Sequence, residues 1–155
     1  MKLLASLLAA ALLIGCTPEE EATGFEVSLS LRDKFGQEAS TFSTEETITL
    51  QLRVENTGDS AATLNFNNGQ AYDFTISNSA GAEIWHWSAD KSFTEATEST
   101  TFAAGEVRFY SADWDQEDDS NAAVPAGSYR AAGEVTASNL DDDVAKSETD
   151  SLTIQ

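Results

Sequence analysis

The alternation of apolar and polar residues constrains the fold of this chain more than any other feature of its sequence. Apolar side chains occupy every second position in two segments: Phe25, Val27, Leu29 and Leu31 in the first, and Ile48, Leu50, Leu52 and Val54 in the second. Successive side chains of a β-strand point to opposite faces of its sheet, so a period of two gathers the apolar residues on one face. Both segments therefore predict strands that turn one face towards a hydrophobic core.

Short apolar segments separated by turn residues continue this pattern to the end of the chain. Further strands are expected around Leu64 and Phe66, Tyr72 to Ile76, Ile84 to Trp87, Val107 to Phe109, Tyr129 to Val135, and Leu152 to Ile154. Asn68-Gly69 predicts a tight hairpin between two of them, because both residue types tolerate positive φ. Helical periodicity is almost absent, so the chain predicts an all-β fold, an antiparallel β-sandwich of about 7–9 strands. A closed barrel of the same size is the alternative.

Two long connections interrupt the regular spacing of these strands. One runs from Ser88 to about Thr101, and the other runs from about Asp113 to Val124. Loops held on a rigid scaffold are where binding residues concentrate. We therefore expect the two connections to bind a partner, with Phe93 and Trp114 as their candidate contact residues.

The N-terminal segment has the features of a secretory leader. Lys2 precedes an uncharged apolar run that ends in Leu13-Ile14-Gly15-Cys16, and this run is too short to cross a membrane as a helix. It resembles a bacterial lipoprotein signal, which implies removal of residues 1–15 and acylation of Cys16. An ordinary cleaved signal with a chance cysteine is the alternative. Residues 16–23 would then be a lipidated N-terminus with an acidic linker, and residues 24–155 the β-sandwich domain.

The acidic composition of the chain limits the classes of molecule that it is expected to bind. The chain carries 8 basic and 27 acidic residues, a formal net charge of −19. Nucleic acid is not expected as a partner because phosphate binding needs clustered Lys and Arg, and docking on anionic lipid headgroups is not expected for the same reason. The acidity is interpreted as solubility or adaptation to a salty medium, with attraction to a basic partner as the alternative. Cys16 is the only cysteine, so no internal disulfide is expected.

A set of motifs between residues 46 and 135 carries a resemblance to a known family. The residues are Val54-Glu55-Asn56-Thr57-Gly58, Phe66, Gly69-Gln70-Ala71-Tyr72-Asp73-Phe74, Gly81, Ile84-Trp85-His86-Trp87-Ser88, Phe93, Ala104-Gly105-Glu106, Trp114 and Pro125-Ala126-Gly127-Ser128-Tyr129. In this pattern the chain resembles the BsuPI intracellular proteinase inhibitor family. The resemblance implies an immunoglobulin-like sandwich and inhibition of serine proteases. The family takes its name from a cytoplasmic member, whereas the leader of this chain predicts export.

The aromatic residues of these motifs are interpreted mainly as structural. Trp85 and Trp87 lie two positions apart, so they share one face of a strand and, with Tyr72 and Phe74, are expected to fill the core or stack across strands. The alternative is an exposed aromatic rim for peptide or glycan stacking. Tyr129, two residues after Gly127, fits a tyrosine corner, in which the phenol bonds back to nearby backbone.

The sequence predicts no catalytic site, no cofactor and no metal site. His86 is the only histidine, and no G-x-S-x-G, H-E-x-x-H or Cys/His motif accompanies it, so a non-catalytic strand position is expected. The acidic run from Asp113 to Asp119 fails the EF-hand pattern, because Asp118 and Val124 stand where Gly and Glu are required. We interpret it as a solvated loop, with calcium binding as the alternative. Asp141 to Asp143 are expected to form a turn between the last two strands.

These observations favour a non-enzymatic lipoprotein that binds another protein. The specific hypothesis is inhibition of a serine protease of the cell envelope. Thr17, and not an aspartate, follows Cys16, and in this the chain resembles sorted lipoproteins that are passed on to the outer membrane. The resemblance implies a domain that faces the periplasm. The alternative function is a non-inhibitory envelope scaffold or accessory lipoprotein with a protein- or glycan-binding surface.

Overall fold

The computed structural model describes residues 24–148 and 151–155, and Cys16 lies outside them. These residues form eleven strands and one short helix. The strands are β1 (Phe25–Arg32), β2 (Thr41–Phe42), β3 (Ile48–Asn56), β4 (Ala62–Phe66), β5 (Tyr72–Asn78), β6 (Glu83–His86), β7 (Glu98–Phe102), β8 (Val107–Trp114), β9 (Gly127–Val135), β10 (Lys146–Glu148) and β11 (Leu152–Ile154); the helix is α1 (Asp142–Ala145). The strands beyond the predicted seven to nine have two to five residues, too few for an apolar period to be visible in the sequence.

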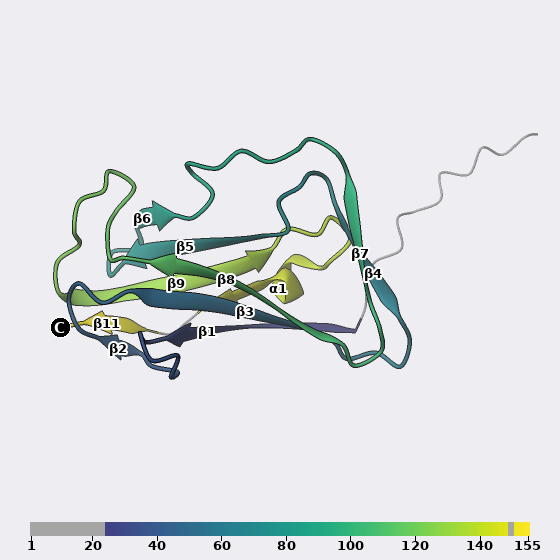
Figure 1. Ribbon diagram of the computed structural model, residues 1–155, viewed down its shortest axis with the longest axis horizontal. Helices are drawn as coiled ribbons and strands as arrows, with labels where there is room; N and C mark the ends of the chain where they lie inside the picture. The colour runs from purple at the N-terminus through teal and green to yellow at the C-terminus, as the bar shows by residue number, and fades with distance from the viewer. Residues whose placement is uncertain (1–23, 149–150) are drawn as a thin grey trace, which may run out of the picture.

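Two sheets form the body of the molecule (Figure 1). The first has the order β1-β3-β8, and the second has the order β2-β11-β9-β5-β6, with β10 also paired to β9. All these pairs are antiparallel except β2 with β11. Both sheets are open, so the fold is the predicted immunoglobulin-like β-sandwich and not the closed barrel.

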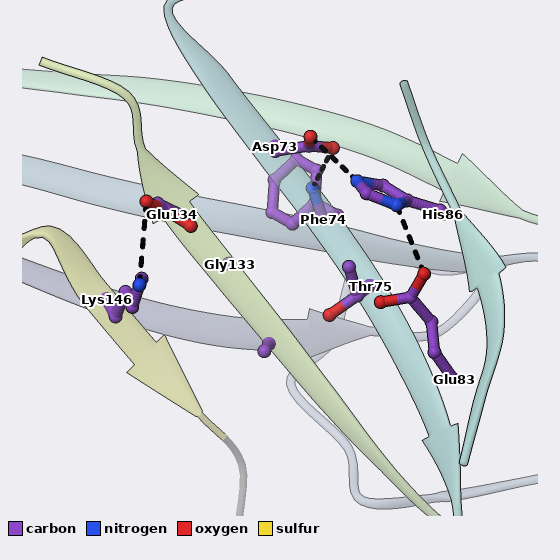
Figure 2. A pocket seen from close by; sticks show the side chains of 9 residues that line it. Asp73, Phe74, Thr75, Glu83, His86, Gly133, Glu134 and Lys146 are labelled. Atoms are coloured by element: carbon purple, nitrogen blue, oxygen red, sulfur yellow. Dashed lines mark hydrogen bonds and ion pairs between the residues drawn. The ribbon is translucent and has the colours of Figure 1, made fainter. Parts of the chain in front are cut away.

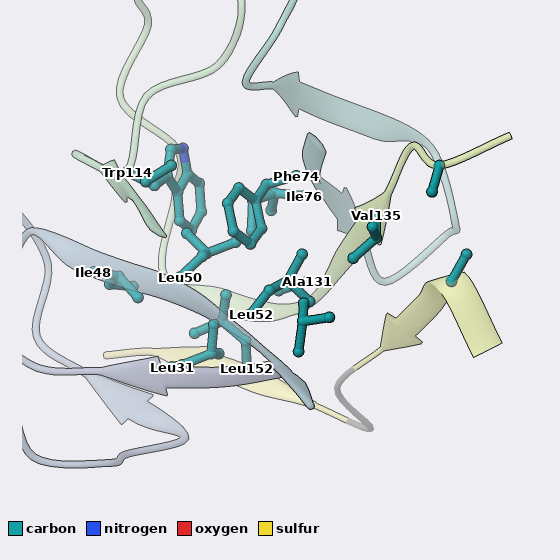
Figure 3. Packing of buried hydrophobic residues seen from close by; sticks show 14 of the residues in the cluster. Leu31, Ile48, Leu50, Leu52, Phe74, Ile76, Trp114, Ala131, Val135 and Leu152 are labelled. Atoms are coloured by element: carbon teal, nitrogen blue, oxygen red, sulfur yellow. The ribbon is translucent and has the colours of Figure 1, made fainter. Parts of the chain in front are cut away.

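The core lies between the two sheets and is built from the alternating residues of the sequence pattern (Figure 3). The inward rows of β3 and β9 are fully buried, and those of β5 and β8 pack on them. The buried side chains include Leu31, Ile48, Leu50, Leu52, Val54, Phe74, Ile76, Trp114, Ala131, Val135 and Leu152. The outward residues between them are half-buried or exposed, as the period of two predicts.

The predicted hairpin at Asn68-Gly69 is wrong. β4 does not pair with β5; it pairs with β7 in a separate two-stranded sheet at one end of the sandwich (Figure 1). Gly69 is needed there for close approach rather than for positive φ: a Cβ would lie 2.5 Å from Thr94 Oγ1, and Gly69 N donates to Thr94 O at 2.8 Å. β7 occupies residues that the sequence assigned to a long connection, because its Ser and Thr side chains carry no apolar alternation.

The predicted turn at Asp141 to Asp143 is also corrected. Asp141 caps the short helix α1, its side chain accepting from Asp143 N at 2.9 Å, so two of the three aspartates belong to the first helical turn. An acidic first turn suits the positive end of the helix dipole. In the described part of the chain, no helix is long and apolar enough to cross a membrane.

The sandwich has two distinct ends. Gly24 immediately precedes β1, and we call the end of the sandwich where it lies the proximal end. Its carbonyl accepts from Thr57 N and Thr57 Oγ1 at 2.6 and 2.7 Å. β1 has eight residues and therefore spans about 25 Å. At its far end, which we call the distal end, β1 stops, β3 begins and β8 stops. The loops at the distal end are the β1–β2, β2–β3 and β8–β9 connections.

Candidate protein-binding surface

A cleft of about 400 Å³ lies between the two connections that the sequence singled out. One wall is β6 with the start of the β6–β7 connection, and the other is the end of β8 with the β8–β9 connection, residues 115–126. We call this hollow the acidic cleft. Its lining residues are Trp85, His86, Trp87, Ala89, Asp90, Lys91, Asp113, Asp118, Asp119 and Asn121.

Aromatic rings form the floor of the acidic cleft and join it to the core. Tyr72 stacks between Trp87 and Tyr110, with ring centroids 4.5 and 5.0 Å away. Trp85 lies against the buried Trp114 at 6.2 Å. The two cleft tryptophans are half-buried, so each ring serves the core on one side and the cleft on the other. The Lys91 ammonium lies 4.9 Å from the Trp87 ring centroid, a cation–π contact at the cleft edge.

The β8–β9 connection, residues 115–126, which we call the acidic loop, packs tightly onto β6. Asp119 N donates to Ile84 O at 3.0 Å, and Asp119 Oδ1 accepts from His86 N at 3.0 Å, so this loop covers the edge of β6. Asp118 Oδ1 accepts from Ser120 Oγ and from the backbone N–H groups of Ser120 and Ala122. These hydrogen bonds lower the pKa of the Asp118 carboxyl, and the bond from the Ser120 hydroxyl has the largest effect. Asp118 therefore stays charged, and the excess of carboxylates over lysine in the lining gives the cleft a negative potential.

Gln116 joins this loop to the rest of the distal end. Its side chain is buried, and its Nε2 donates to Ser43 O and Glu46 O at 2.8 and 2.9 Å. Its Oε1 accepts from Glu45 N at 3.1 Å. A buried amide with both ends bonded fixes the β2–β3 and β8–β9 connections to each other. Sequence reasoning missed this residue, since a lone glutamine in an acidic run carries no motif.

A second group of motif residues meets on the outer face of the larger sheet (Figure 2). Asp73 Oδ2 accepts from Gln70 Nε2, Ser88 Oγ and His86 Nε2 at 2.8, 2.6 and 2.9 Å. His86 Nδ1 lies 3.1 Å from Glu83 Oε1. Ser88 bonds to the carboxylate and not to the imidazole, so the three side chains lack the Ser–His contact that would activate a nucleophile. The network instead ties β5, β6 and the following connection together.

The structure places the predicted contact residues close to the core. Trp114 is 1% exposed, with its Nε1 donating to Glu117 O at 2.7 Å, so its ring is not available to a partner. Its ring points inward because Trp114 follows the buried Ala112 two positions along β8 and pairs with the buried Ile48 of β3. Phe93 is half-buried against Trp87, with ring centroids 6.0 Å apart. The exposed surface of the two connections is therefore mainly polar and acidic.

The motif aromatics have the structural positions that were expected of them. Phe74 is 1% exposed, and Tyr72, Trp85 and Trp87 are half-buried in the aromatic stack. Tyr129 OH donates to Pro125 O at 2.6 Å, which is the tyrosine corner. Within residues 24–148 and 151–155, no group of three or more His, Cys, Asp or Glu side chains is arranged to hold a metal ion.

Comparison with known families explains why these residues occur together. The family model described as BsuPI, intracellular proteinase inhibitor, matches residues 23–140, about three quarters of the chain. The chain belongs to the BsuPI family. The resemblance inferred from the sequence motifs is thereby confirmed, and the match extends beyond residues 46–135 at both ends. No curated protein matches the chain. Membership indicates a proteinase-inhibitor-like domain with a protein partner.

Several solved structures are similar to the BsuPI chain at low identity. A CARDB domain from Pyrococcus furiosus is 11% identical, with a TM-score of 0.46 and coverage of 88% of this chain and 91% of that one. A β-glucosidase from Erythrobacter marinus is 14% identical, with a TM-score of 0.46 and coverage of 84% and 15%. An alkylpurine DNA glycosylase from Pseudomonas fluorescens is 12% identical, with a TM-score of 0.45 and coverage of 85% and 30%.

The BsuPI motifs in this chain have mainly structural roles. Asn56 is fully buried, and its Nδ2 donates to Ser60 O, Phe102 O and Ala103 O while its Oδ1 accepts from Gly58 N. It fixes the β3–β4 turn to the β7–β8 turn at the proximal end. Gln70 and Ser88 hold Asp73, as described above. The residues that carry the family likeness thus build the scaffold. The distal loops, in contrast, present mainly exposed and acidic side chains.

Proposed function

We propose that this domain inhibits a serine protease of the cell envelope by binding it through the loops of its distal end. The proposal rests on family membership and on one structural observation: the distal loops are hydrogen-bonded to each other and to the sheets. Gln116 links the β2–β3 and β8–β9 connections, and Asp119 links the latter to β6. A loop already ordered in its bound form loses little entropy on binding.

The negative charge of the acidic cleft would steer a basic protease towards this side of the domain. Four carboxylates line it, those of Asp90, Asp113, Asp118 and Asp119, against one lysine, Lys91. Opposite potentials on two partners raise the association rate more than the final affinity. A protease with a basic rim around its active site would therefore be captured fastest by this end of the domain.

An inhibition assay tests the proposed function. The purified full chain in detergent is mixed with a subtilisin-type protease, and the residual hydrolysis of a small peptide substrate is recorded. We expect the rate to fall in proportion to the added chain and to reach its minimum near a one-to-one ratio. Digestion of the chain, or full protease activity at high excess of the chain, would contradict the proposal.

The location of the domain is a further part of the proposal. We propose that Cys16 is acylated and that the domain is held at the outer membrane, facing the periplasm. Several acyl chains on one residue would give lasting attachment, since each buried methylene contributes about 0.8 kcal/mol. The distal end, opposite Gly24, would then face away from the lipid surface. Cys16→Ser should move the chain from the membrane fraction to the soluble fraction or leave it unprocessed; unchanged membrane association would contradict the anchor.

A glycan- or protein-binding envelope lipoprotein without inhibitory action is the second candidate. The half-buried Trp85 and Trp87 at the floor of the acidic cleft support it, because sugar rings stack on tryptophan faces. Purification of the tagged chain with its bound proteins from membranes separates the two. Recovery of an assembly or secretion machine without a protease would favour this second function.

A further inference from the structure

Phe35 is the most exposed large hydrophobic residue in the part of the chain that the structure describes, with 75% of its surface open to water. It lies at the tip of residues 33–37, between β1 and β2, which we call the Phe35 turn. The Lys34 ammonium lies 5.4 Å from its ring centroid. A single exposed apolar side chain is common on protein surfaces. What distinguishes Phe35 is the rigidity of the backbone that presents it.

Every backbone N–H group from Asp33 to Gln37 donates a hydrogen bond within the domain. Asp33 Oδ1 accepts from Phe35 N and Gln37 N at 2.9 and 2.8 Å. Gly36 N donates to Asp33 O and Asp33 N donates to Gln37 O, at 2.8 and 2.9 Å. Lys34 N donates to Glu46 Oε1 at 3.3 Å. Gly36 has φ of 77°, a conformation that glycine adopts without strain.

This bonding leaves the side chain, and not the backbone, as the group that a partner can use. An extended peptide pairs with a protein edge through its free backbone N–H and C=O groups. The donors of the Phe35 turn are already committed, so the turn cannot lie in a protease cleft as an extended substrate does. It can insert one aromatic ring into an apolar pocket while its peptide bonds stay out of reach of the catalytic groups.

The Phe35 turn belongs to the same end of the molecule as the acidic loop. Glu46 accepts from Lys34 N through its side chain, and its own carbonyl accepts from Gln116 Nε2. Glu46 and Gln116 thus connect the two surfaces within the distal end. In the proposed anchoring, the lipid surface lies on the side of Gly24, at the end of the domain opposite to Phe35, so a lipid surface is not the expected partner of this ring. The net charge of −19 repels a second copy of the chain.

We propose that Phe35 is the anchor of the inhibitory contact, and that its ring fills the apolar specificity pocket of a protease that prefers large aromatic residues. This inference rests on the proposed function and names the class of its target. Aromatic side chains on a rigid support are frequent among the residues that dominate binding energy.

The test compares variants of the full chain in detergent against two proteases, one that cleaves after aromatic residues and one that cleaves after Lys or Arg. Phe35→Ala should raise the inhibition constant for the first protease by about 30-fold or more. Phe109→Ala is the matched control, because Phe109 is 57% exposed on β8 and away from the turn; it should change the constant by less than about twofold. Phe35→Arg should shift inhibition towards the second protease.

The outcomes distinguish failure of the Phe35 anchor role from failure of the proposed protease inhibition. If the unaltered chain inhibits and Phe35→Ala inhibits equally well, the anchor role is overturned and the proposed function stands. If the unaltered chain inhibits neither protease, both are overturned. A loss in Phe35→Ala accompanied by conversion of a dimer to a monomer, or by loss of binding to uncharged lipid vesicles, would assign the ring to another copy or to a membrane and overturn the inference.

Discussion

Gly133 of β9 lies directly against Leu52 of β3, across the interface between the two sheets. A Cβ on Gly133 would lie 2.8 Å from Leu52 Cδ2 and 2.9 Å from its Cγ, and Leu52 is fully buried. Gly133→Ala should therefore lower the free energy of unfolding by about 1–3 kcal/mol, as overpacking of a tight core does. Urea unfolding measures the change. Ala132→Ser on the outer face is the control, and an equal effect there would show that the contact with Leu52 is not the cause.

The tyrosine corner gives a second prediction about stability. Tyr129→Phe removes the 2.6 Å hydrogen bond from the phenol to Pro125 O and keeps the ring. The free energy of unfolding should fall by about 1 kcal/mol, the usual net contribution of one hydrogen bond. Tyr110→Phe is the matched control, since the Tyr110 hydroxyl has no hydrogen bond to any described residue. Equal unfolding midpoints for the two variants would contradict a stabilising corner.

The sandwich follows from the sequence because burial on one face leaves a visible period. Phe25 to Leu31 and Ile48 to Val54 alternate without a break, and both became long strands. The prediction of a hairpin at Asn68-Gly69 was wrong because Asn and Gly, which suit a tight turn, also suit a loop that makes a close backbone contact. Gly69 makes that contact with Thr94, and the residue that would reveal it lies 25 positions away.

The candidate surface follows from the sequence only in part. The two connections were identified by their length, but their contact residues were not, because Phe93 and Trp114 turn inward onto Trp87 and Trp85. Gln116 and Phe35 carry no sequence motif, and their importance depends on burial in one case and exposure in the other. A pattern along one segment cannot indicate which other loop that segment will meet.

His86 gives a prediction about pH. Its partial burial lowers the imidazole pKa, but the hydrogen bonds and charges of Asp73 and Glu83 outweigh this and raise the pKa above its ordinary value of 6.5. Protonation thus favours the folded state: the stabilisation is complete below pH 6.5 and is lost as the pH rises through the higher folded pKa.

The difference in melting temperature between the unaltered chain and His86→Gln should therefore be largest near pH 5 and should shrink by pH 8. NMR titration of the single imidazole measures its pKa directly. A pKa below 6.5, or a difference that grows with pH, would contradict the reported role of Asp73 and Glu83.

The acidic loop gives a prediction about rates. Asp118→Asn keeps an Oδ1 acceptor for Ser120 N and Ala122 N but removes one charge from the cleft. The association rate with the target protease should fall, and it should fall more at low salt, while the dissociation rate should change little. Stopped-flow kinetics at several salt concentrations measure both. Asp59→Asn, an exposed change in the proximal β3–β4 turn, should leave both rates unchanged; equal effects would attribute the steering to net charge.

Hydrogen–deuterium exchange of the full chain, alone and with a saturating amount of the inhibited protease, tests the central claim most directly. We predict slower exchange in the complex within residues 33–37, 43–47 and 115–124, which form the distal end. Residues 57–60 and 103–106 at the proximal end should exchange at the same rate in both samples. Protection confined to the proximal end, or no difference in the distal loops, would contradict the account.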